Sequence, residues 1–561
     1  MADLQSALNI PLPLATILVQ RGFLLADEGR EFLYPTLQAL PSPFLMKGMQ
    51  EAVEIIQHAI KTKQPIVIYG DYDVDGVTAT AVLVKFFSYL GVPCCSCHPD
   101  RFKNGYGLKA ELVEGLSPQR PGVLITVDCG ISDLAPVVRL VDQGWQVIIT
   151  DHHQPPEQLP PAHAILNPWQ AGCQFPSKDL AGVGVSFFLV MGLRNYLQQQ
   201  GYWQEQAQTP PNLKKLLDLV AVGTISDMVP LRGTNRILAK AGLEVLVETD
   251  NPGLIKLLEL CHFPRGQNLT TEDISFQIGP RLNAAGRMGD AGRASTLLSS
   301  GDPVVVRQLA EVINRENMAR RELTTQLVAE AIAMVEAQGP CQQPCLILHD
   351  RNWHLGLLGI ISSKLVDLFH KPTIIFGGMG VLKGSARSIP GINIHEIISA
   401  CAEKILEYGG HSCAAGLSLK EENFHPFVTM ANDVLMRYGG SNEQHPRLNV
   451  DFVMTDKTEF ADLETTCAQL APFGQGNPEP IFTTDRPCRL RNMQVIGKEK
   501  NHLRFAAFLA DRWLEGVGFG FASVAEQAVN GEALLTLAFS LKENRFNGQT
   551  KPQIMLHDVL I

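Results

Sequence analysis

The stretch Asp71-Tyr72-Asp73-Val74-Asp75-Gly76 guides the interpretation of the whole chain. It lies between an apolar, β-type run at residues 65–69 and a helix-like run at residues 77–90. Three carboxylates therefore crowd one strand-to-helix turn, and ionised carboxylates this close repel one another. A bound divalent cation offsets such repulsion because hard cations take oxygen ligands. Open α/β sheets also bind ligands just outside the carboxyl ends of their strands, where this turn falls.

Strands and helices alternate around this turn. Apolar runs that predict strands occupy residues 65–69, 92–97, 122–128 and 146–150. Runs that predict helices fill residues 78–90 and 134–143 between them. This order predicts a parallel sheet with right-handed crossovers.

The rest of the chain divides by pattern into further segments. Helices dominate to about residue 300, residues 345–349 and 372–376 predict strands of a second α/β unit, and short strands separated by turns begin near residue 447. We therefore expect an α/β multidomain protein. Its expected segments are an N-terminal helical segment at 1–60, a parallel-sheet catalytic domain at 61–302, a long connector helix at 303–338, a second α/β domain at 339–440 and an OB-like β-barrel at 446–561.

Composition narrows the class of protein. The 561 residues are 45% hydrophobic and 19% charged, which excludes a disordered chain, and twelve cysteines in this length do not suggest a disulfide scaffold. No apolar run reaches about 18 residues and the first ten residues lack a signal-peptide pattern, so we expect no membrane span and a cytoplasmic location. The net charge of −10 argues against a surface coated in nucleic acid, although a binding groove is a local feature.

Further acidic and imidazole side chains follow other predicted strands. Asp128 ends the run at 122–128, Asp151-His152-His153 follows the run at 146–150, and Asp227 comes just after a helical run. Three of these sites fall at strand ends of one sheet, so we expect them to converge. Carboxylates with one or two imidazoles suit Mn²⁺ or Mg²⁺ better than they suit a thiolate-rich zinc site, and shared carboxylates allow two cations about 3.5–4 Å apart.

Each piece has an ordinary structural explanation when it is taken alone. An Asp after a strand is commonly the N-cap of the next helix, which applies to Asp71 and Asp151. A His pair is usually a polar surface feature. The metal site is favoured because all of the pieces fall at the same edge of one sheet.

Cys94-Cys95-Ser96-Cys97-His98 contains the C-x-x-C-H pattern of haem attachment. We reject that interpretation because such attachment needs export, and the segment instead predicts a buried strand in which Cys is a small apolar residue.

The motifs at 71–76, 127–130, 151–153 and 226–231 resemble, in this order and spacing, the DHH phosphoesterase superfamily. The segments at 277–287, 356–365, 384–390 and 409–416 look like the associated DHHA1 domain, and residues 471–482 are similar to the motif that opens the OB domain of the RecJ family. The resemblance covers roughly residues 45–561. It is closest to the bacterial single-strand-specific exonucleases, whereas the related cyclic-dinucleotide and nanoRNA phosphodiesterases lack the OB domain.

The resemblance implies a set of site residues. The implied ligands of two Mn²⁺ or Mg²⁺ ions are Asp71, Asp73, Asp75, Asp128, His152 and Asp227. His153 joins Asp73, Asp75, Asp128, His152 and Asp227 as a catalytic residue, and we expect it to donate a hydrogen bond to a phosphate oxygen.

The residues expected to bind the substrate lie in predicted loops that carry arginines. Guanidinium groups bind phosphate bidentately. By resemblance, a 5′-terminal phosphate is held by Arg101, Arg281, Ser385 and Arg387, and the cleft is lined by Asn283, Arg287, His354 and His411. We expect Arg281 and Arg287 in one loop bounded by Gly and Ser385 and Arg387 in another, with Arg293 and Arg320 as ordinary surface residues.

The C-terminal region has its own basic stretch. The candidates for nucleic-acid binding are Arg489, Arg491, Lys498, Lys500 and Arg504. Phe505 and Phe508 follow, and a barrel that holds charge on the backbone with rings under the bases suits a single strand. We expect at least one of the two rings in the core because alternate strand positions are buried.

The sequence thus predicts a metal-dependent 5′→3′ exonuclease of single-stranded DNA with a role in repair and recombination. One alternative is a phosphodiesterase of cyclic dinucleotides or nanoRNA, which the extra OB-like domain disfavours. Another is a DNA-binding scaffold with a decayed site, which the intact acidic and His set disfavours. The resemblance implies single-strand-binding protein and a helicase as partners of a monomer.

Overall fold

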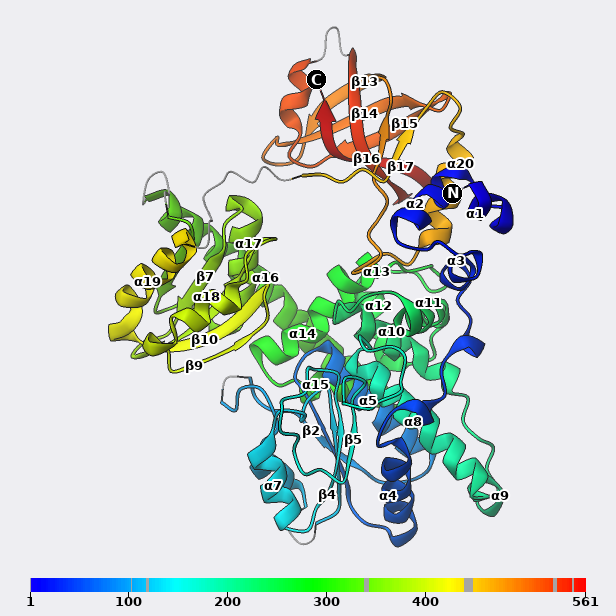
Figure 1. Cartoon of the computed structure of the whole chain (residues 1–561), viewed down its shortest axis with the longest axis vertical. Coiled ribbons are helices and arrows are strands. Elements are labelled where there is room, and N and C mark those ends of the chain that lie inside the picture. The colour runs from blue at the N-terminus through cyan, green and yellow to red at the C-terminus, as the bar shows by residue number, and fades with distance from the viewer. Residues whose placement is uncertain are drawn as a thin grey trace. The chain divides into compact units, whose positions relative to one another are not determined.

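The computed structural model describes residues 2–101, 103–117, 121–337, 343–437, 447–527, 532–546 and 549–560 (Figure 1). The chain forms two compact units. One comprises Met1–Ser42, Met228–Glu244 and His445–Ile561, and the other comprises Pro43–Asp227 and Val245–Gln444.

The second unit begins with a five-stranded parallel sheet in the order β2-β1-β3-β4-β5. Its strands are β1 (Ile66–Gly70), β2 (Cys95–Cys97), β3 (Val123–Val127), β4 (Gln146–Thr150) and β5 (Ala164–Leu166). The predicted parallel sheet is confirmed, and β5 is a strand that the sequence pattern did not predict. The chain reverses its direction of winding between β1 and β3, and ligands bind at such a switch point in open α/β sheets.

Helices cover both faces of this sheet. On one face, α6 (Ala110–Leu116) and α7 (Leu134–Asp142) place Val113, Val137 and Leu140 against Val67 and Leu124 in one apolar cluster. On the other face lie α4 (Met49–Thr62), α5 (Val74–Tyr89) and α8 (Gly182–Gln199), which all contact β3. Alternate residues of each strand thus face different helix layers.

The expectation that residues 94–97 form a buried strand is wrong. β2 is an edge strand, and both Cys95 and Ser96 are exposed. A short edge strand has only one pairing neighbour, so its side chains stay in contact with solvent.

Residues 202–299 are mostly helical. The helices include α9 (Tyr202–Glu205), α10 (Leu217–Ser226), α11 (Gly233–Val247), α12 (Pro252–Leu260), α13 (Thr271–Asp273), a π-helix at Ile274–Ile278, α14 (Gly279–Met288) and α15 (Gly292–Ser299). The predicted long helix is present as α16 (Pro303–Ala337).

A mixed sheet in the order β6-β7-β8-β10-β9 follows in the same unit. Its strands are β6 (Leu346–Asp350), β7 (Thr373–Gly377), β8 (Val381–Arg387), β9 (Glu407–Gly410) and β10 (Ala414–Lys420). α17 (Leu358–Phe369) packs on one face with α16, while α18 (Ile394–Ala400) and α19 (Phe424–Arg437) share an apolar cluster on the other.

The other unit contains a closed barrel. β13 (Cys488–Ile496), β14 (His502–Leu509), β15 (Arg512–Gly518), β17 (Gln549–Leu560) and β16 (Glu532–Phe546) pair in a ring, because β16 pairs with both β17 and β13. β11 (Phe452–Met454) and β12 (Phe482–Thr484) extend the sheet beside β16. A five-stranded closed sheet agrees with the predicted OB-like barrel.

The N-terminal helices belong to this barrel unit. α1 (Ala2–Leu8), α2 (Leu12–Gln20) and α3 (Ala26–Leu33) share one apolar core with the barrel and with α20 (Phe460–Leu470), and Figure 1 shows α2 beside α20. Leu14, Leu18 and Phe32 lie in that core together with Leu463 and Phe539.

Arg236 ties three stretches of the barrel unit together. Its side chain is 1% exposed, and its Nε donates to the Phe32 carbonyl at 2.6 Å. Its Nη2 donates to the carbonyls of Leu470 and Ala471 at 3.0 and 2.8 Å. Burial lowers the pKa of Arg236 to about 9. Backbone carbonyl oxygens accept its hydrogen bonds and so stabilise the buried cation in place of an acid.

Candidate active site

The carboxylates of the first turn are positioned by local hydrogen bonds. Asp73 is the N-cap of α5, and its Oδ1 accepts from the backbone N–H groups of Asp75 and Gly76 at 2.9 and 3.2 Å. Asp75 is fully buried, and its two carboxylate oxygens accept from the N–H groups of Gly182 and Val183 at 2.6 and 2.8 Å. The N-terminus of α8 therefore fixes the orientation of Asp75 and favours its negative charge.

Asp128 follows β3 in a left-handed backbone conformation, with φ at 61°. Asp tolerates this region better than most residues, and functional sites often hold such conformations. A β-carbon on Gly182 would lie 2.8 Å from Asp128 Oδ1. The absence of a side chain at residue 182 thus leaves room for the Asp128 carboxylate beside Asp75.

His152 lies among three carboxylates. Its Nε2 is 3.1 Å from Asp128 Oδ1, 3.7 Å from Asp227 Oδ2 and 3.8 Å from Asp75 Oδ2. Asp227 reaches the group from the C-terminal end of α10, where it is the C-cap. The predicted convergence of strand-end and helix-end side chains is therefore present in the structure.

Asp151 orients the two histidines. Its Oδ1 accepts from the backbone N–H groups of His152 and His153 and, at 2.7 Å, from His153 Nδ1, and its Oδ2 accepts from the Ile131 N–H. Burial alone would raise the pKa of Asp151, but the bond from His153 and the charges of both histidines lower it. Burial opposes the charge on His153, yet the bond to Asp151 raises the His153 pKa to about 9. The ion pair with Asp151 therefore favours the protonated form of His153.

The remaining carboxylates repel one another strongly. Burial raises the pKa of Asp71, Asp75, Asp128 and Asp227 above the ordinary value. The charge of a neighbouring Asp raises it further for each of the four. Such a group needs a cation or protons to be stable when it is buried.

The donor atoms suit hard cations. Three sets have ligand atoms within 4.8 Å of one another, namely Asp71 with Asp73 and Asp128, Asp75 with His152 and Asp227, and Asp128 with His152 and His153. Within the described part of the chain, Asp71 Oδ1, Asp128 Oδ1, His152 Nε2 and Asp227 Oδ2 are buried without a hydrogen-bond partner. Oxygen and imidazole donors without a thiolate fit Mn²⁺ or Mg²⁺. Asp128 belongs both to the set with Asp71 and Asp73 and to the set with His152 and His153.

A group of four arginines lies beside the carboxylates. Burial lowers the pKa of Arg287 to about 10, and the positive charges of Arg101, Arg320 and Arg387 lower it further. Among the residues that the structure describes, none of these four is within ion-pair distance of a carboxylate. Arg101 stacks over the Tyr72 ring at 5.0 Å, and the negative charge of Asp73 acts on Arg287. This arginine group is therefore positive and lies next to the acidic turn.

Ser385 and Arg387 contribute from the second sheet. They lie on strand β8, so the expectation of a loop is wrong for them. Arg387 Nη1 donates to Ser385 Oγ at 3.2 Å, and Arg287 Nη1 donates to the Gly356 carbonyl at 3.0 Å. These contacts bring the two α/β parts of this unit together around the arginine group.

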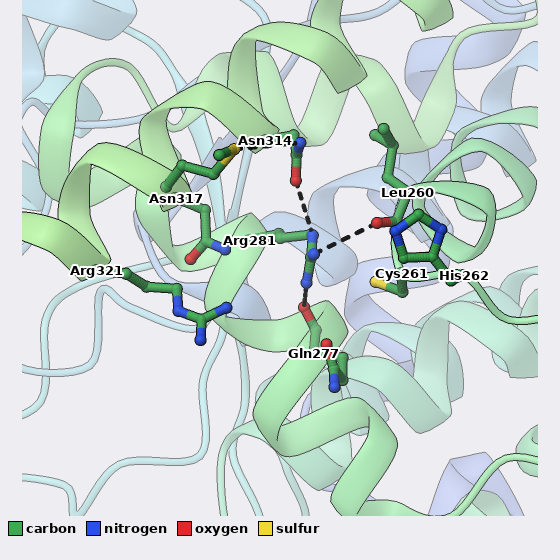
Figure 2. A pocket seen from close by; sticks show the side chains of 9 residues that line it. Leu260, Cys261, His262, Gln277, Arg281, Asn314, Asn317 and Arg321 are labelled. Carbon is green, nitrogen blue, oxygen red and sulfur yellow. Dashed lines mark hydrogen bonds between the residues drawn. The ribbon is translucent and has the colours of Figure 1, made fainter. Parts of the chain in front are cut away.

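Arg281 does not join this group. Arg281 and Arg287 lie on helix α14 rather than in a loop, and six residues along a helix place them on different faces. Arg281 faces another pocket, where it donates to Asn314 Oδ1, the Gln277 carbonyl and the Leu260 carbonyl (Figure 2).

Two other predicted residues make local backbone contacts. His354 accepts from the Gly356 N–H at its Nδ1 and caps a short helical turn. His411 is exposed in the turn between β9 and β10, and its backbone N–H donates to Ala414. In the part of the chain that is described, neither Asn283 nor His411 forms a side-chain hydrogen bond.

Sequence reasoning missed several residues of the site. Arg320 was expected at the surface but is part of the arginine group, whereas Arg293 forms an ion pair with Glu316 as a structural residue would. Tyr106 lies 3.3 Å from His153 Nδ1 through its hydroxyl. His98 bonds the Asp71 carbonyl through Nδ1 at 2.9 Å. Tyr106 lies in the same short motif as Arg101, so the sequence could have indicated its place in the site. Arg320 lies in no such motif.

The basic residues of the barrel lie at its surface. Arg489 and Arg491 are exposed at alternate positions of β13, Arg504 is exposed on β14, and Lys498 and Lys500 lie in the turn between these strands. Phe505 is in the core at 2% exposure, which confirms that at least one ring is buried.

An aromatic surface accompanies these residues. The ring of Phe508 is 37% exposed and lies 5.4 Å from that of Trp513, and the Arg491 guanidinium stacks over Trp513 at 3.8 Å. Trp513 was not predicted.

Three sequence profiles match the chain in order. They are those of the DHH family, N-terminal domain, at residues 65–224, the DHHA1 domain at 342–437 and the RecJ OB domain at 450–558. The single-stranded-DNA-specific exonuclease RecJ of Bacillus subtilis is 36% identical over 562 residues, which cover 100% of this chain and 69% of the relative. The chain belongs to the RecJ family. The RecJ of Salmonella typhimurium is also 36% identical, over 92% of this chain and 90% of the relative.

Solved RecJ structures agree with this assignment. RecJ in complex with Mn²⁺ from Thermus thermophilus superposes with a TM-score of 0.82 at 27% identity, covering 100% of this chain and 77% of that one. An exonuclease RecJ bound to manganese gives a TM-score of 0.60 at 31% identity, over 71% of this chain and 96% of that one. Among the described helices, none has the length and apolar character that crossing a membrane requires.

Proposed function

We propose that this protein is a metal-dependent exonuclease that degrades single-stranded DNA from its 5′ end. The observation that carries the proposal is a cluster of buried carboxylates joined to an unpaired group of arginines. Acidic side chains suit metal ions, and guanidinium groups suit the phosphate of a strand end. The relatives named single-stranded-DNA-specific exonuclease RecJ support single-stranded DNA as the substrate.

The carboxylates would hold two Mn²⁺ or Mg²⁺ ions. Asp71, Asp73 and Asp128 suit one ion, and Asp75, His152 and Asp227 suit the other. Asp128, which also lies near His152, would serve both ions. Bound ions of this kind polarise the scissile phosphate and lower the pKa of a water molecule. Gly182 and Val183 hold Asp75 in place for this role through their N–H groups.

His153 and the arginines would orient the substrate. His153 uses Nδ1 to donate to Asp151, which leaves Nε2–H of the imidazolium to donate to a phosphate oxygen. Arg101, Arg287, Ser385 and Arg387 would bind the 5′-terminal phosphate and so set the polarity of digestion. The barrel would bind the strand through its basic residues and Trp513.

A test compares substrates and metals. A single DNA strand labelled at either end, its RNA equivalent, a blunt duplex and a cyclic dinucleotide are each incubated with Mn²⁺, Mg²⁺ or EDTA. We expect mononucleotides from the 5′ end of single-stranded DNA with a metal and no product with EDTA. Preferred cleavage of the cyclic dinucleotide would favour the small-substrate phosphodiesterase, which the match to the RecJ OB domain disfavours.

The cellular setting follows from the same proposal. A DNA substrate and a repair role favour a cytoplasmic location. We also expect a monomer that works with single-strand-binding protein and a helicase. These partners rest on the family resemblance alone.

A further inference from the structure

A pocket of about 410 Å³ lies in the helical part of the larger unit (Figure 2). It is formed by the C-terminal end of α12, the π-helix at Ile274–Ile278, α14 and α16. None of the carboxylates or imidazoles of the metal centre lines it. The polar lining residues are His262, Gln277, Arg281, Asn314, Asn317 and Arg321.

The pocket is positive. Its lining has two guanidinium groups and an imidazole but no carboxylate. The described residues place no carboxylate within ion-pair distance of Arg281 or Arg321. Arg281 donates to three neutral oxygens, at 3.1 Å to Asn314, 2.7 Å to Gln277 and 3.5 Å to Leu260. These bonds fix the side chain without neutralising its charge, and they use three of its five N–H groups.

Amide donors complete the lining. Asn317 is 3% exposed, and its Oδ1 accepts from Arg320 Nη2 at 3.0 Å, which leaves its NH₂ group as a donor. Arg320 belongs to the arginine group of the active site, so Asn317 lies between the two sites. A buried amide donor next to guanidinium groups that lack an acid suits an anion with several oxygens.

The neighbouring π-helix adds an aromatic ring. π-helical turns are rare and frequently occur at functional sites. Phe276 lies in this turn, next to Gln277 of the pocket, and its ring is 74% exposed. Phe276 does not line the pocket itself, but it directly precedes a lining residue, and exposed rings together with cationic donors are the combination that binds nucleotides of a single strand.

We propose that this pocket is a second phosphate site, in which Arg281 and Arg321 bind a phosphate group and Phe276 stacks on the adjoining base. The phosphate belongs either to the strand being processed or to a released mononucleotide. The strand source rests on the proposed function, whereas the phosphate chemistry does not.

The first experiment measures strand binding in EDTA, where cleavage cannot occur. Arg321 is exposed, so Arg321→Ala is expected to fold, and Arg315→Ala is the matched control because Arg315 is an exposed arginine of the same helix outside the pocket. Affinity for an oligothymidylate is followed by fluorescence anisotropy across salt concentrations. The slope of log affinity against log salt should fall by about 0.7 in Arg321→Ala and stay unchanged in Arg315→Ala.

The second experiment tests free ligands. Inorganic phosphate and thymidine 5′-monophosphate are titrated by calorimetry in an Arg387→Ala background, which weakens binding at the arginine group beside the metals. Adding Arg321→Ala should weaken mononucleotide binding roughly tenfold or more if the pocket takes a free product. Phe276→Ala should weaken binding of the mononucleotide and leave that of inorganic phosphate unchanged.

The outcomes separate the sources. A changed salt slope with unchanged mononucleotide binding assigns the pocket to the strand, and weaker mononucleotide binding assigns it to the product. Unchanged values in both experiments would overturn the proposal. If wild-type protein cleaved no strand while phosphate binding still required Arg321, the exonuclease proposal would fail and the pocket would stand.

Discussion

A β-carbon on Gly286 would lie 2.5 Å from the carbonyl oxygen of Tyr72. Helix α14 therefore rests directly on the turn that carries Asp71, Asp73 and Asp75. The same helix carries Arg287 to the arginine group. One close contact thus sets the distance between the proposed metal ligands and the proposed phosphate ligands.

Gly286→Ala should disturb this spacing. The added methyl group must push the turn or the helix apart, and overpacking of this kind costs about 1–3 kcal/mol of stability. Misplacement of reacting groups by about 1 Å lowers a rate by roughly a hundredfold. Gly115→Ala is the control because Gly115 is also helical and has open space at its β-carbon. Thermal unfolding and cleavage rates of both variants test the contact, and equal rates would contradict it.

Asp227→Ala should abolish cleavage and leave the fold intact. Burial raises the pKa of Asp227, so its charge opposes folding at neutral pH without metal. The variant should unfold at the same or a higher temperature than wild type in EDTA and lose most of the stabilisation that Mn²⁺ gives. Asp142→Ala, at an exposed position of α7, should behave as wild type. Near-normal turnover of Asp227→Ala at saturating metal would contradict the two-metal assignment.

Asp75→Ala should differ from Asp227→Ala in its stability. Removal of the Asp75 carboxylate leaves the N–H groups of Gly182 and Val183 buried without their acceptor. Each unsatisfied group costs about 1–3 kcal/mol. We therefore expect loss of cleavage together with a lower unfolding temperature, and Asp75→Asn should recover part of the stability without activity.

Arg387→Ala should reduce the preference for a 5′-phosphate. Loss of a charged hydrogen bond costs about 1.5–3 kcal/mol, or roughly tenfold or more in affinity. Strands with a 5′-hydroxyl should be much less affected. Arg293→Ala is the control because Arg293 forms an ion pair with Glu316. The measurement is KM for strands with a 5′-phosphate and for strands with a 5′-hydroxyl. An equal increase in KM for both would show that Arg387 does not bind the 5′-phosphate.

Trp513→Ala should weaken binding of long single strands. Stacking of a base on an aromatic ring contributes about 1–3 kcal/mol. The change also removes the ring beneath Arg491. Cleavage of very short oligonucleotides should change little if they bind only near the metals. Val453→Ala, at an exposed apolar position of β11, provides the control. Unchanged affinity for long strands would mean that this surface of the barrel does not bind DNA.

Asp218→Asn should alter the pH dependence of stability. Burial raises the pKa of Asp218 to about 6 from 3.8, although Thr249 and the Leu219 N–H donate to the carboxylate. The folded state thus binds a proton more tightly than the unfolded state, so stability falls as pH rises from about 4 to 6. The fall amounts to about 3 kcal/mol. The asparagine Oδ1 can still accept from the Leu219 N–H, and its NH₂ group must instead donate to the Thr249 hydroxyl oxygen. The variant should therefore be more stable than wild type at pH 7 in urea unfolding, by up to that amount.

The convergence of the acidic and imidazole side chains was largely predictable from the sequence. Asp71, Asp128 and His152 follow strands that the apolar runs marked, and parallel strands end at one edge of a sheet. The order of the elements therefore implied their convergence. The sequence could not reveal that Gly182 leaves space for Asp128, because that contact joins segments 54 residues apart.

The arginines show where local patterns fail. Arg281 and Arg287 lie in one motif, but the helical repeat turns them to different sites. Arg320 looked like a surface residue because its helix is polar over most of its length. Its place beside Arg287 depends on how α16 packs on α14, and a single sequence holds no record of that packing.

The shared core of the N-terminal helices and the barrel has a consequence for biosynthesis. Leu14, Leu18 and Phe32 are translated before their partners, and residues such as Leu463 and Phe539 emerge from the ribosome more than 400 residues later. At about 5–20 residues per second the delay is roughly 20 to 100 s. During that interval the nascent helices expose apolar surface, so ribosome-associated chaperones should engage residues 1–42 until the barrel closes.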